Sequence, residues 1–389
     1  MGCIKMNQPS VVVVGSGLAG YTVVRELRKL DTAVPITLLS ADHGSFYSKP
    51  MLSNALATGK TPDSILSAGT MQMSGQLDIT VRPYTSVNAI DVAAGSVSFE
   101  EGGQLTYDRL VLALGADPIR LPIPGEGVDE ILSVNNLDDY RKFREALESK
   151  RHIAILGAGL IGCEFANDLA AKGYQVSVFD LSPQPLGRLL PPEAGRFFRD
   201  KLTAAGVNFL LGTTVERVSK ENGYYQLFYE GGKVVQADMI LSAVGLRPRT
   251  RLAAVAGIQV NRGIAVNRYL QTSIQNIYAL GDCAEVEGKV LPFILPIAHA
   301  GRALAATIAG NPTLLHYPAM PVMVKTPACP TVVSPPDPAV QGEWEVVAIE
   351  NGMKALYHDE AGNLHGFALL GTATVERNTL ASRLPPVLA

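Results

Sequence analysis

The sequence predicts an α/β protein with two similar units and a small C-terminal domain of the α+β, β-rich kind. The stretch SVVVVGSGLAGYTVVRELRKL has an apolar strand, a glycine turn and apolar residues at helical spacing. About 140 residues later, RHIAILGAGLIGCEFANDLAAKGYQVSVFD repeats that plan. After residue 316, proline and β-branched residues become frequent, and WEVVAIENGMKALYHDEAGNLHGFALLG alternates like an antiparallel sheet with two turns. The two units therefore follow the strand–turn–helix plan of Rossmann-like domains.

Composition limits the function classes. A chain of 389 residues exceeds one ordinary core, so we expect two or three domains. The formal net charge of -3, with both signs interspersed, argues against nucleic-acid binding, which needs a basic excess. No window reaches the roughly 18 apolar residues of a membrane helix, and the N-terminus lacks a signal peptide. We expect a soluble, cytoplasmic protein without stable membrane insertion. Met6 is a second possible start, which leaves open whether residues 1–5 are native.

The four cysteines, Cys3, Cys163, Cys283 and Cys329, are widely scattered. They form neither a C-x-x-C pair nor a zinc spacing, so we expect free thiols and no metal site.

The first glycine fingerprint is Gly15-x-Gly17-x-x-Gly20. Gly15 allows the tight turn, Gly17 lets the backbone approach a pyrophosphate, and Gly20 permits close packing of the helix on the strand. The amides at the helix start then face the phosphate charge. We expect a bound dinucleotide here; the alternative is a glycine turn without a ligand.

The next strand of this unit ends in Ser40-Ala41, with Asp42 just beyond. Since no acid stands at the strand end itself, the ribose contact must come from Ser40, Asp42 or the backbone.

The second fingerprint is Gly157-x-Gly159-x-x-Gly162, and Asp180 ends the following strand 18 residues after Gly162. A carboxylate there can accept hydrogen bonds from a ribose diol and repels a 2′-phosphate, so it favours NADH over NADPH. Arg188, slightly downstream, weakens that exclusion. The alternative for Asp180 is an ordinary turn residue at a strand end.

A third signal indicates which nucleotide each unit binds. TSIQNIYALGD places Asp282 after an apolar strand, which resembles the second FAD motif of flavoprotein reductases that bind two dinucleotides. LVLALGAD and ILSAVGLRP resemble the strands that join the two domains of such enzymes. The resemblance implies a discontinuous FAD-binding domain of residues 1–118 and 243–316. It also implies an NADH-binding domain of residues 119–242 and a β-rich domain of residues 317–389 that completes the flavin site.

The same resemblance assigns roles to the stretch FYSKPMLS. It implies that Lys49 lies near flavin N5 and pairs with Glu164 of the second unit, so that a cation sits where charge develops when hydride arrives. We expect these two residues to be catalytic; the alternative is a salt bridge remote from any ligand. A helix beginning near Pro296 would point its N-terminus at flavin N1 and the C2 carbonyl. Lys325 would reinforce that end, or else is a solvated loop lysine.

What the sequence lacks limits how electrons can leave the flavin, and a resemblance then implies the acceptor. Disulfide reductases of this superfamily need a cysteine pair beside the flavin, and this sequence has none, so electrons must leave the flavin directly. YSKPMLS, GAGLIGCEFANDL, NIYALGDCAEV and VKTPACPTVVSPP together are similar to bacterial rubredoxin reductases of alkane-oxidising pathways. This resemblance implies hydride transfer from NADH to FAD, then two one-electron transfers to rubredoxin in a transient complex, feeding alkane hydroxylation. Ferredoxin reductases are less similar, with arginine in place of Lys49 and lysine in place of Asn54.

Three other interpretations stay open: a ferredoxin-type reductase of the same fold, or one serving nitric-oxide-reducing rubredoxin-like partners; an NADH oxidase; and a flavin-bound NADH sensor or scaffold. The resemblance also implies that the backbone of Val87 contacts the adenine and that Ile294 lies beside the flavin pyrimidine. The cofactor-binding residues that the fingerprints and the resemblance imply are Gly15, Gly17, Leu18, Ala19, Gly20, Ser40, Ala41, Asp42, Lys49, Pro50, Val87, Ala113, Gly115, Gly157, Gly159, Leu160, Ile161, Gly162, Glu164, Asp180, Gly245, Asp282, Ile294, Pro296 and Lys325.

Overall fold

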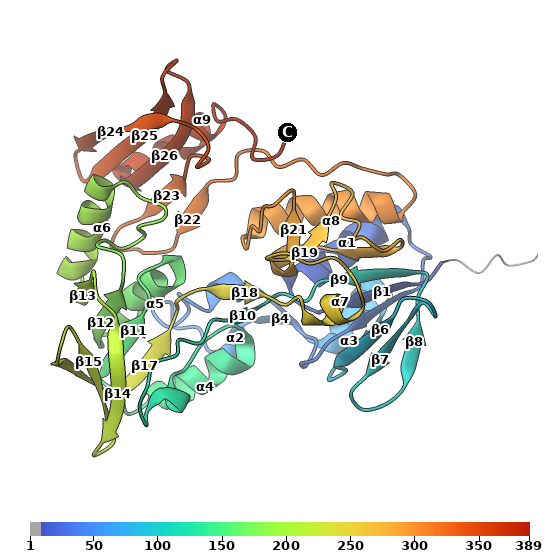
Figure 1. Cartoon of the computed structure of the whole chain (residues 1–389), viewed down its shortest axis with the longest axis horizontal. Coiled ribbons are helices and arrows are strands. Elements are labelled where there is room, and N and C mark those ends of the chain that lie inside the picture. Colours follow the sequence, from blue (N-terminus) through green and yellow to red (C-terminus); the bar gives the residue numbers. More distant parts are fainter. Residues whose placement is uncertain (1–8) are drawn as a thin grey trace, which may run out of the picture.

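The structure is a computed structural model that describes residues 9–389. Cys3 and the question of whether residues 1–5 are native therefore lie outside the described residues. Figure 1 shows three parts: the first unit on the right, the second at the lower left, and the C-terminal domain at the upper left. The α/β class and the β-rich third part are confirmed.

The first unit is built on a five-stranded parallel sheet in the order β20-β9-β1-β2-β5. Its central strand β1 is buried along its whole length, as expected for a parallel strand covered on both faces. Helices α1 and α8 pack closely on one face (Figure 1), and a Cβ added at Gly301 of α8 would lie 2.6 Å from Thr22 Cγ2. The sheet is formed by β1 (Val11–Val14), β2 (Ile36–Leu39), β5 (Thr80–Arg82), β9 (Arg109–Leu112) and β20 (Ile277–Ala279), with helices α1 (Leu18–Leu30), α3 (Thr70–Leu77) and α8 (Ile294–Ile308).

Strand β20 lies more than 160 residues beyond β9 in sequence and yet pairs with it. This pairing agrees with a discontinuous first domain, whose exact boundaries stay a prediction. The smaller elements of this unit are β3 (Phe46–Tyr47), η1 (Lys49–Met51), α2 (Pro62–Ile65), β4 (Leu66–Ala68), β6 (Val87–Asp91), β7 (Ser96–Phe99), β8 (Gln104–Thr106), α7 (Arg251–Val255), β19 (Ile264–Val266), η3 (Gly281–Cys283) and β21 (Ala284–Val286).

The second unit repeats the plan with a four-stranded parallel sheet in the order β13-β12-β11-β17. An antiparallel sheet of β14, β15 and β16 lies beside it. Two short antiparallel strands, β10 (Ala116–Pro118) and β18 (Leu246–Pro248), connect the units, as the motifs LVLALGAD and ILSAVGLRP predict. The unit comprises η2 (Val128–Glu130), α4 (Leu137–Leu147), β11 (His152–Leu156), α5 (Leu160–Ala170), β12 (Gln175–Asp180), α6 (Pro192–Ala204), β13 (Val207–Leu211), β14 (Val215–Glu221), β15 (Tyr224–Tyr229), β16 (Lys233–Ala237) and β17 (Met239–Ser242).

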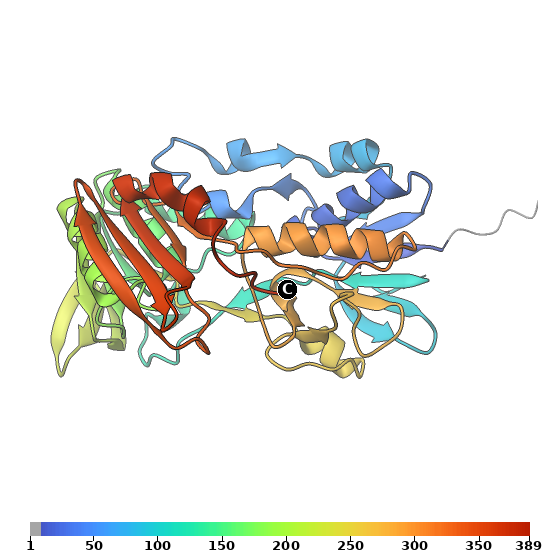
Figure 2. The same ribbon diagram turned by 90° about the horizontal axis from the view of Figure 1, so that it is seen from above.

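The third part is a five-stranded antiparallel sheet in the order β22-β23-β26-β25-β24. Figure 2 shows this sheet at the left, beyond one end of α8. Its inner face shares one apolar core with α5 and α6 of the second unit, through residues such as Val333 and Leu370. Its elements are β22 (Val322–Val324), β23 (Thr331–Ser334), β24 (Gly342–Ile349), β25 (Gly352–Asp359), β26 (Leu364–Gly371), η4 (Thr372–Glu376) and α9 (Arg377–Ala381).

Across residues 9–389, no helix is both long enough and apolar enough to span a bilayer. Within the same residues, no group of three metal-ligating side chains comes together.

Candidate functional site

The glycine loop between β1 and α1 forms an open cradle. Gly15 has φ +114°, and a Cβ there would lie 2.2 Å from the carbonyl oxygen of Ala113. A Cβ at Gly20 would lie 1.9 Å from the Gly15 carbonyl oxygen, so α1 can approach the loop only because both residues lack side chains. Around Gly17, in contrast, the position of a Cβ is open space. The loop therefore packs tightly on the protein side and leaves its middle glycine free to meet a pyrophosphate.

The loop between β11 and α5 has the same geometry. Gly157 has φ +104°, and a Cβ there would lie 2.6 Å from the Ala243 carbonyl oxygen. A Cβ at Gly162 would lie 1.9 Å from the Gly157 carbonyl oxygen, whereas the corresponding space at Gly159 is open. The second unit thus offers a second cradle of the same form.

Asp180 is the last residue of β12, as predicted. Its Oδ2 accepts a hydrogen bond from the Ala158 amide at 2.5 Å, and its Oδ1 accepts one from the Ser182 amide at 2.7 Å. The carboxylate is therefore fixed against the glycine loop. Each oxygen keeps a further lone pair with which to accept a ribose hydroxyl.

In the first unit, Ser40 and Asp42 form one network. The Ser40 hydroxyl donates to Asp42 Oδ1 at 2.6 Å, and the Gly44 amide donates to the same oxygen at 2.9 Å. Ser16 Oγ, from the glycine loop, lies 2.6 Å from Ser40 Oγ. The acid just beyond β2 is thus held beside the loop, although it does not stand at the strand end.

Lys49 and Asp282 are close enough for the charge of each to shift the pKa of the other. Lys49 begins η1, and Asp282 lies in η3, which follows β20. Burial lowers the pKa of the Lys49 amine, and the charge of Asp282 partly opposes that shift. Burial raises the pKa of Asp282, while Lys49 lowers it. No hydrogen-bond donor of residues 9–389 reaches the Asp282 carboxylate, which leaves its oxygens available to a ligand hydroxyl.

The predicted ion pair between Lys49 and Glu164 is wrong. The Lys49 amine instead donates to Asn135 Oδ1 at 2.8 Å. Glu164 lies on α5 with 0% of its surface exposed, and its Oε2 is 2.7 Å from Lys325 Nζ. Its Oε1 accepts the backbone amide of Lys325 at 2.9 Å, and the Ser53 hydroxyl donates to Oε2. With both oxygens occupied in this way, Glu164 needs no contact with Lys49.

Lys325 joins the three parts of the chain. Besides pairing with Glu164 of the second unit, its amine donates to Pro50 O and, at 3.1 Å, to Ser53 Oγ of the first unit. The solvated-lysine alternative is therefore wrong, and the expected role toward flavin N1 stays a prediction.

Asp168, one helical turn after Glu164, accepts the amides of Leu56 and Ala57 at 3.0 and 2.8 Å. Sequence reasoning missed this residue, although two acids four residues apart on the largely apolar α5 could have indicated it.

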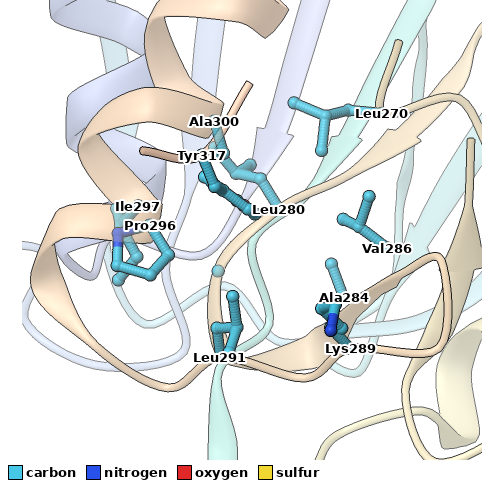
Figure 3. Close-up of a pocket in the computed structure, with 11 residues that line it drawn as sticks. Leu270, Leu280, Ala284, Val286, Lys289, Leu291, Pro296, Ile297, Ala300 and Tyr317 are labelled. Atoms are coloured by element: carbon cyan, nitrogen blue, oxygen red, sulfur yellow. The ribbon is translucent and has the colours of Figure 1, made fainter. Parts of the chain in front are cut away.

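Helix α8 begins at Ile294, two residues before the predicted start. Pro296 lies in its first turn, where the missing amide costs no helix hydrogen bond. Pro296, Leu280 and Gly281 line a small cavity of about 10 Å³. Figure 3 shows Pro296 and Leu280 beside it. The start of α8 is therefore packed against η3, which carries Asp282.

The remaining predicted residues lie in the first turns of α1 and α5 and at the ends of several strands, and their contacts with a nucleotide stay a prediction. Leu18 and Ala19 form the first turn of α1, and Leu160 and Ile161 form that of α5. They are joined by Ala41 after β2, by Val87 at the start of β6, by Ala113 and Gly115 after β9, by Gly245 before β18, and by Ile294, whose surface is 48% exposed.

The cysteines of the described residues are free and buried. Burial raises the pKa of Cys283 and of Cys329 to about 11, and it also raises the pKa of Cys163. These thiols stay protonated near neutral pH, which makes them poor nucleophiles.

These residues fit two dinucleotides, one in each unit. Both loops are tight on one side and open at the central glycine, and each has a carboxylate beside it.

Comparisons with known proteins agree with this geometry. Residues 9–306 match the pyridine nucleotide-disulphide oxidoreductase family, and residues 314–384 match the rubredoxin binding C-terminal domain. A rubredoxin-NAD(+) reductase from Acinetobacter baylyi is 47% identical, over 97% of this chain and 98% of its own length. One from Alcanivorax borkumensis is 45% identical, over 97% of this chain and 99% of its own length.

A crystal structure of a ferredoxin reductase from Rhodopseudomonas palustris is 26% identical, with a TM-score of 0.88 over 97% of this chain and 96% of its own. The chain therefore belongs to the pyridine nucleotide-disulphide oxidoreductase family, which depends on FAD and NAD(H).

Proposed function

We propose that this chain is an FAD-dependent NADH:rubredoxin oxidoreductase. The observation that carries the proposal is that Lys325 binds a C-terminal domain of the rubredoxin-binding type directly to a site with two dinucleotide cradles. In this arrangement FAD occupies the loop at Gly17, and NADH occupies the loop at Gly159. The two relatives named rubredoxin-NAD(+) reductase match over almost the whole chain, which supports the same acceptor.

Bound FAD would supply the conversion between hydride transfer and one-electron transfer, which no side chain of this protein can perform. The protein supplies binding and charge. Lys49 supplies a desolvated ammonium close to Asp282, where it would stabilise negative charge on bound FAD. The carboxylate oxygens of Asp282, which accept no hydrogen bond from residues 9–389, would accept from the hydroxyls of the FAD ribityl chain. The first turn of α8 directs its unpaired amides to the same place.

Asp180 sets the coenzyme preference. Its carboxylate is held by two backbone amides, so it cannot swing away from the place where a ribose 2′-substituent would lie. A 2′-hydroxyl can donate to it, whereas a 2′-phosphate would be repelled. NADH is therefore the expected electron donor.

The test compares acceptors with one preparation of FAD-loaded protein. After anaerobic reduction by NADH, reoxidation is followed by stopped-flow absorbance with rubredoxin, with a two-iron ferredoxin and with oxygen. Rubredoxin should reoxidise the protein fastest. A faster reaction with ferredoxin or with oxygen would identify one of the other reductase types. Slow reduction of every acceptor, together with an NADH-dependent change in oligomeric state, would instead favour a sensor.

The physiological setting is also a proposal. Electrons delivered to rubredoxin would feed alkane hydroxylation in the cytoplasm. Deletion of the gene should then abolish growth on a long-chain alkane and leave growth on succinate unchanged. Equal growth on both carbon sources would contradict this setting without affecting the enzymatic proposal.

A further inference from the structure

A neutral amide binds the amine of Lys49. The Nζ atom donates to Asn135 Oδ1 at 2.8 Å. Among residues 9–389, none of the ion pairs includes this lysine. An amide oxygen satisfies a donor of the ammonium without adding a negative charge. Lys49 is thus held in place, and its positive charge is not cancelled by a partner in contact.

The orientation of the Asn135 amide is fixed by its other contacts. Its Nδ2 donates to the carbonyl oxygen of Ala116 at 2.8 Å, and its backbone amide donates to Asp139 Oδ2 at 3.1 Å. A carbonyl oxygen can only accept and an ammonium can only donate, so one orientation alone satisfies Ala116 and Lys49 together. Asn135 is 9% exposed, which means that a flipped amide would leave a nearly buried donor facing an ammonium.

Asn135 lies between two elements of regular structure and contacts both. Ala116 begins β10, which pairs with β18 between the two units. Asn135 directly precedes Asn136, the residue whose side chain caps α4 by accepting the Asp139 amide at 2.7 Å. The position of the Lys49 amine in the first unit is therefore determined from the second unit.

We propose that Asn135 is a positioning residue that fixes the Lys49 ammonium at the flavin site with its charge intact, and so raises the midpoint potential of FAD. This inference rests on the proposed function, because it requires FAD in the first unit. The carboxylates of Asp282, Asp139 and Asp117 already offset part of the lysine charge from a distance, and the Arg249 guanidinium acts in the opposite direction. A carboxylate in direct contact would cancel that charge and disfavour the reduced, more negative flavin.

The variant Asn135→Asp tests this inference, because it replaces the amide by a carboxylate of the same size. The FAD-loaded protein is titrated anaerobically with dithionite in the presence of a reference dye. We expect reduction of FAD to become about tenfold less favourable, which is about 30 mV more negative for a two-electron couple. Asn136→Asp is the matched control, since it adds the same charge one residue away, and aspartate caps a helix as well as asparagine does. The control should shift the potential by less than a third of that amount.

Equal shifts in the two variants, or no shift in Asn135→Asp, would overturn the inference. If Asn135→Asp does not retain FAD, the variant Asn135→Leu provides the same test. It removes the acceptor at similar volume, so Lys49 is released and the potential should also fall; an unchanged potential would refute the assignment. The lowering should be absent when Asn135→Leu is made in a Lys49→Met background. The titration uses neither NADH nor rubredoxin, so its result does not depend on which acceptor the protein serves. A wild-type protein that binds no FAD would contradict the proposed function itself.

Discussion

The buried ion pair between Lys325 and Glu164 allows a sharp test of what holds the third domain in place. In Lys325→Met, Glu164 stays in its fully buried position on α5 and loses its ammonium partner. Removing one partner of a buried pair costs about 3–5 kcal/mol, because the remaining charge is neither solvated nor paired. Ser53 still donates to Glu164, which places the expected loss near the lower end, at about 3 kcal/mol.

Lys289→Met is the matched control. Lys289 also joins the first unit to the third, through Asp337 at 3.0 Å, but its side chain is 36% exposed and that of Asp337 is 50% exposed. An exposed pair contributes about 0–1 kcal/mol. The two lysine side chains are similarly exposed, at 29% for Lys325 and 36% for Lys289, so the variants compare a fully buried carboxylate with a half-exposed one.

The assay is urea unfolding, followed by tryptophan fluorescence. Trp344 is the single tryptophan of the sequence and lies in β24, so its emission reports directly on the third domain. We expect Lys325→Met to lower the free energy of unfolding by about 3 kcal/mol and Lys289→Met by less than about 1 kcal/mol. Equal losses would show that burial does not decide the strength of these pairs. The double variant Lys325→Met, Glu164→Gln should recover part of the loss, since no buried charge remains.

Three further outcomes are expected. Asp180→Ala should lower the ratio of kcat/KM for NADH over NADPH by about tenfold, and a ratio equal to that of the wild type would remove Asp180 from coenzyme selection. Gly17→Ala should fold normally, as circular dichroism would show, but it should bind FAD weakly. Gly20→Ala should fail to fold, because its Cβ would meet the Gly15 carbonyl oxygen at 1.9 Å. Tight FAD binding by Gly17→Ala would argue against the cradle. Burial lowers the pKa of Lys49 from 10.5, so the rate of flavin reduction should fall with rising pH before the ordinary lysine range is reached. Because the unfolded state then binds more protons, Lys49 should make stability rise with pH across that window, and Lys49→Met should abolish both trends.

The glycine loops and the acid at the end of the second strand of the NADH-type unit could be predicted, because each depends only on residues close together in the sequence. The spacing of Gly15, Gly17 and Gly20 specifies a turn, an open backbone and a close helix contact, and all three are found. Asp180 at the end of β12 follows from the same local plan. The two turns of the third domain could likewise be predicted, because residues that favour turns separate the alternating segments. Asn351 and Gly362 in these turns have positive φ in the structure.

Side-chain partners across domains were not predictable in this way. Lys49 and Asn135 are 86 residues apart, and Glu164 and Lys325 are 161 residues apart. Their pairing depends on how the three parts pack, which no periodicity in the sequence encodes. Asn135 also lies in a segment without any motif, so nothing in the sequence distinguished it from a surface loop residue. Charge complementarity allowed either lysine to serve Glu164, and the packing of β22 on α5 selected Lys325.

Helix α5 starts at the glycine loop of the second unit and is held along its side by Lys325 and by the amides of Leu56 and Ala57. A helix anchored to both neighbouring domains leaves the second unit little freedom to rotate away from them. Exchange of the nicotinamide coenzyme proposed for this unit should accordingly take place without a large rotation of the unit.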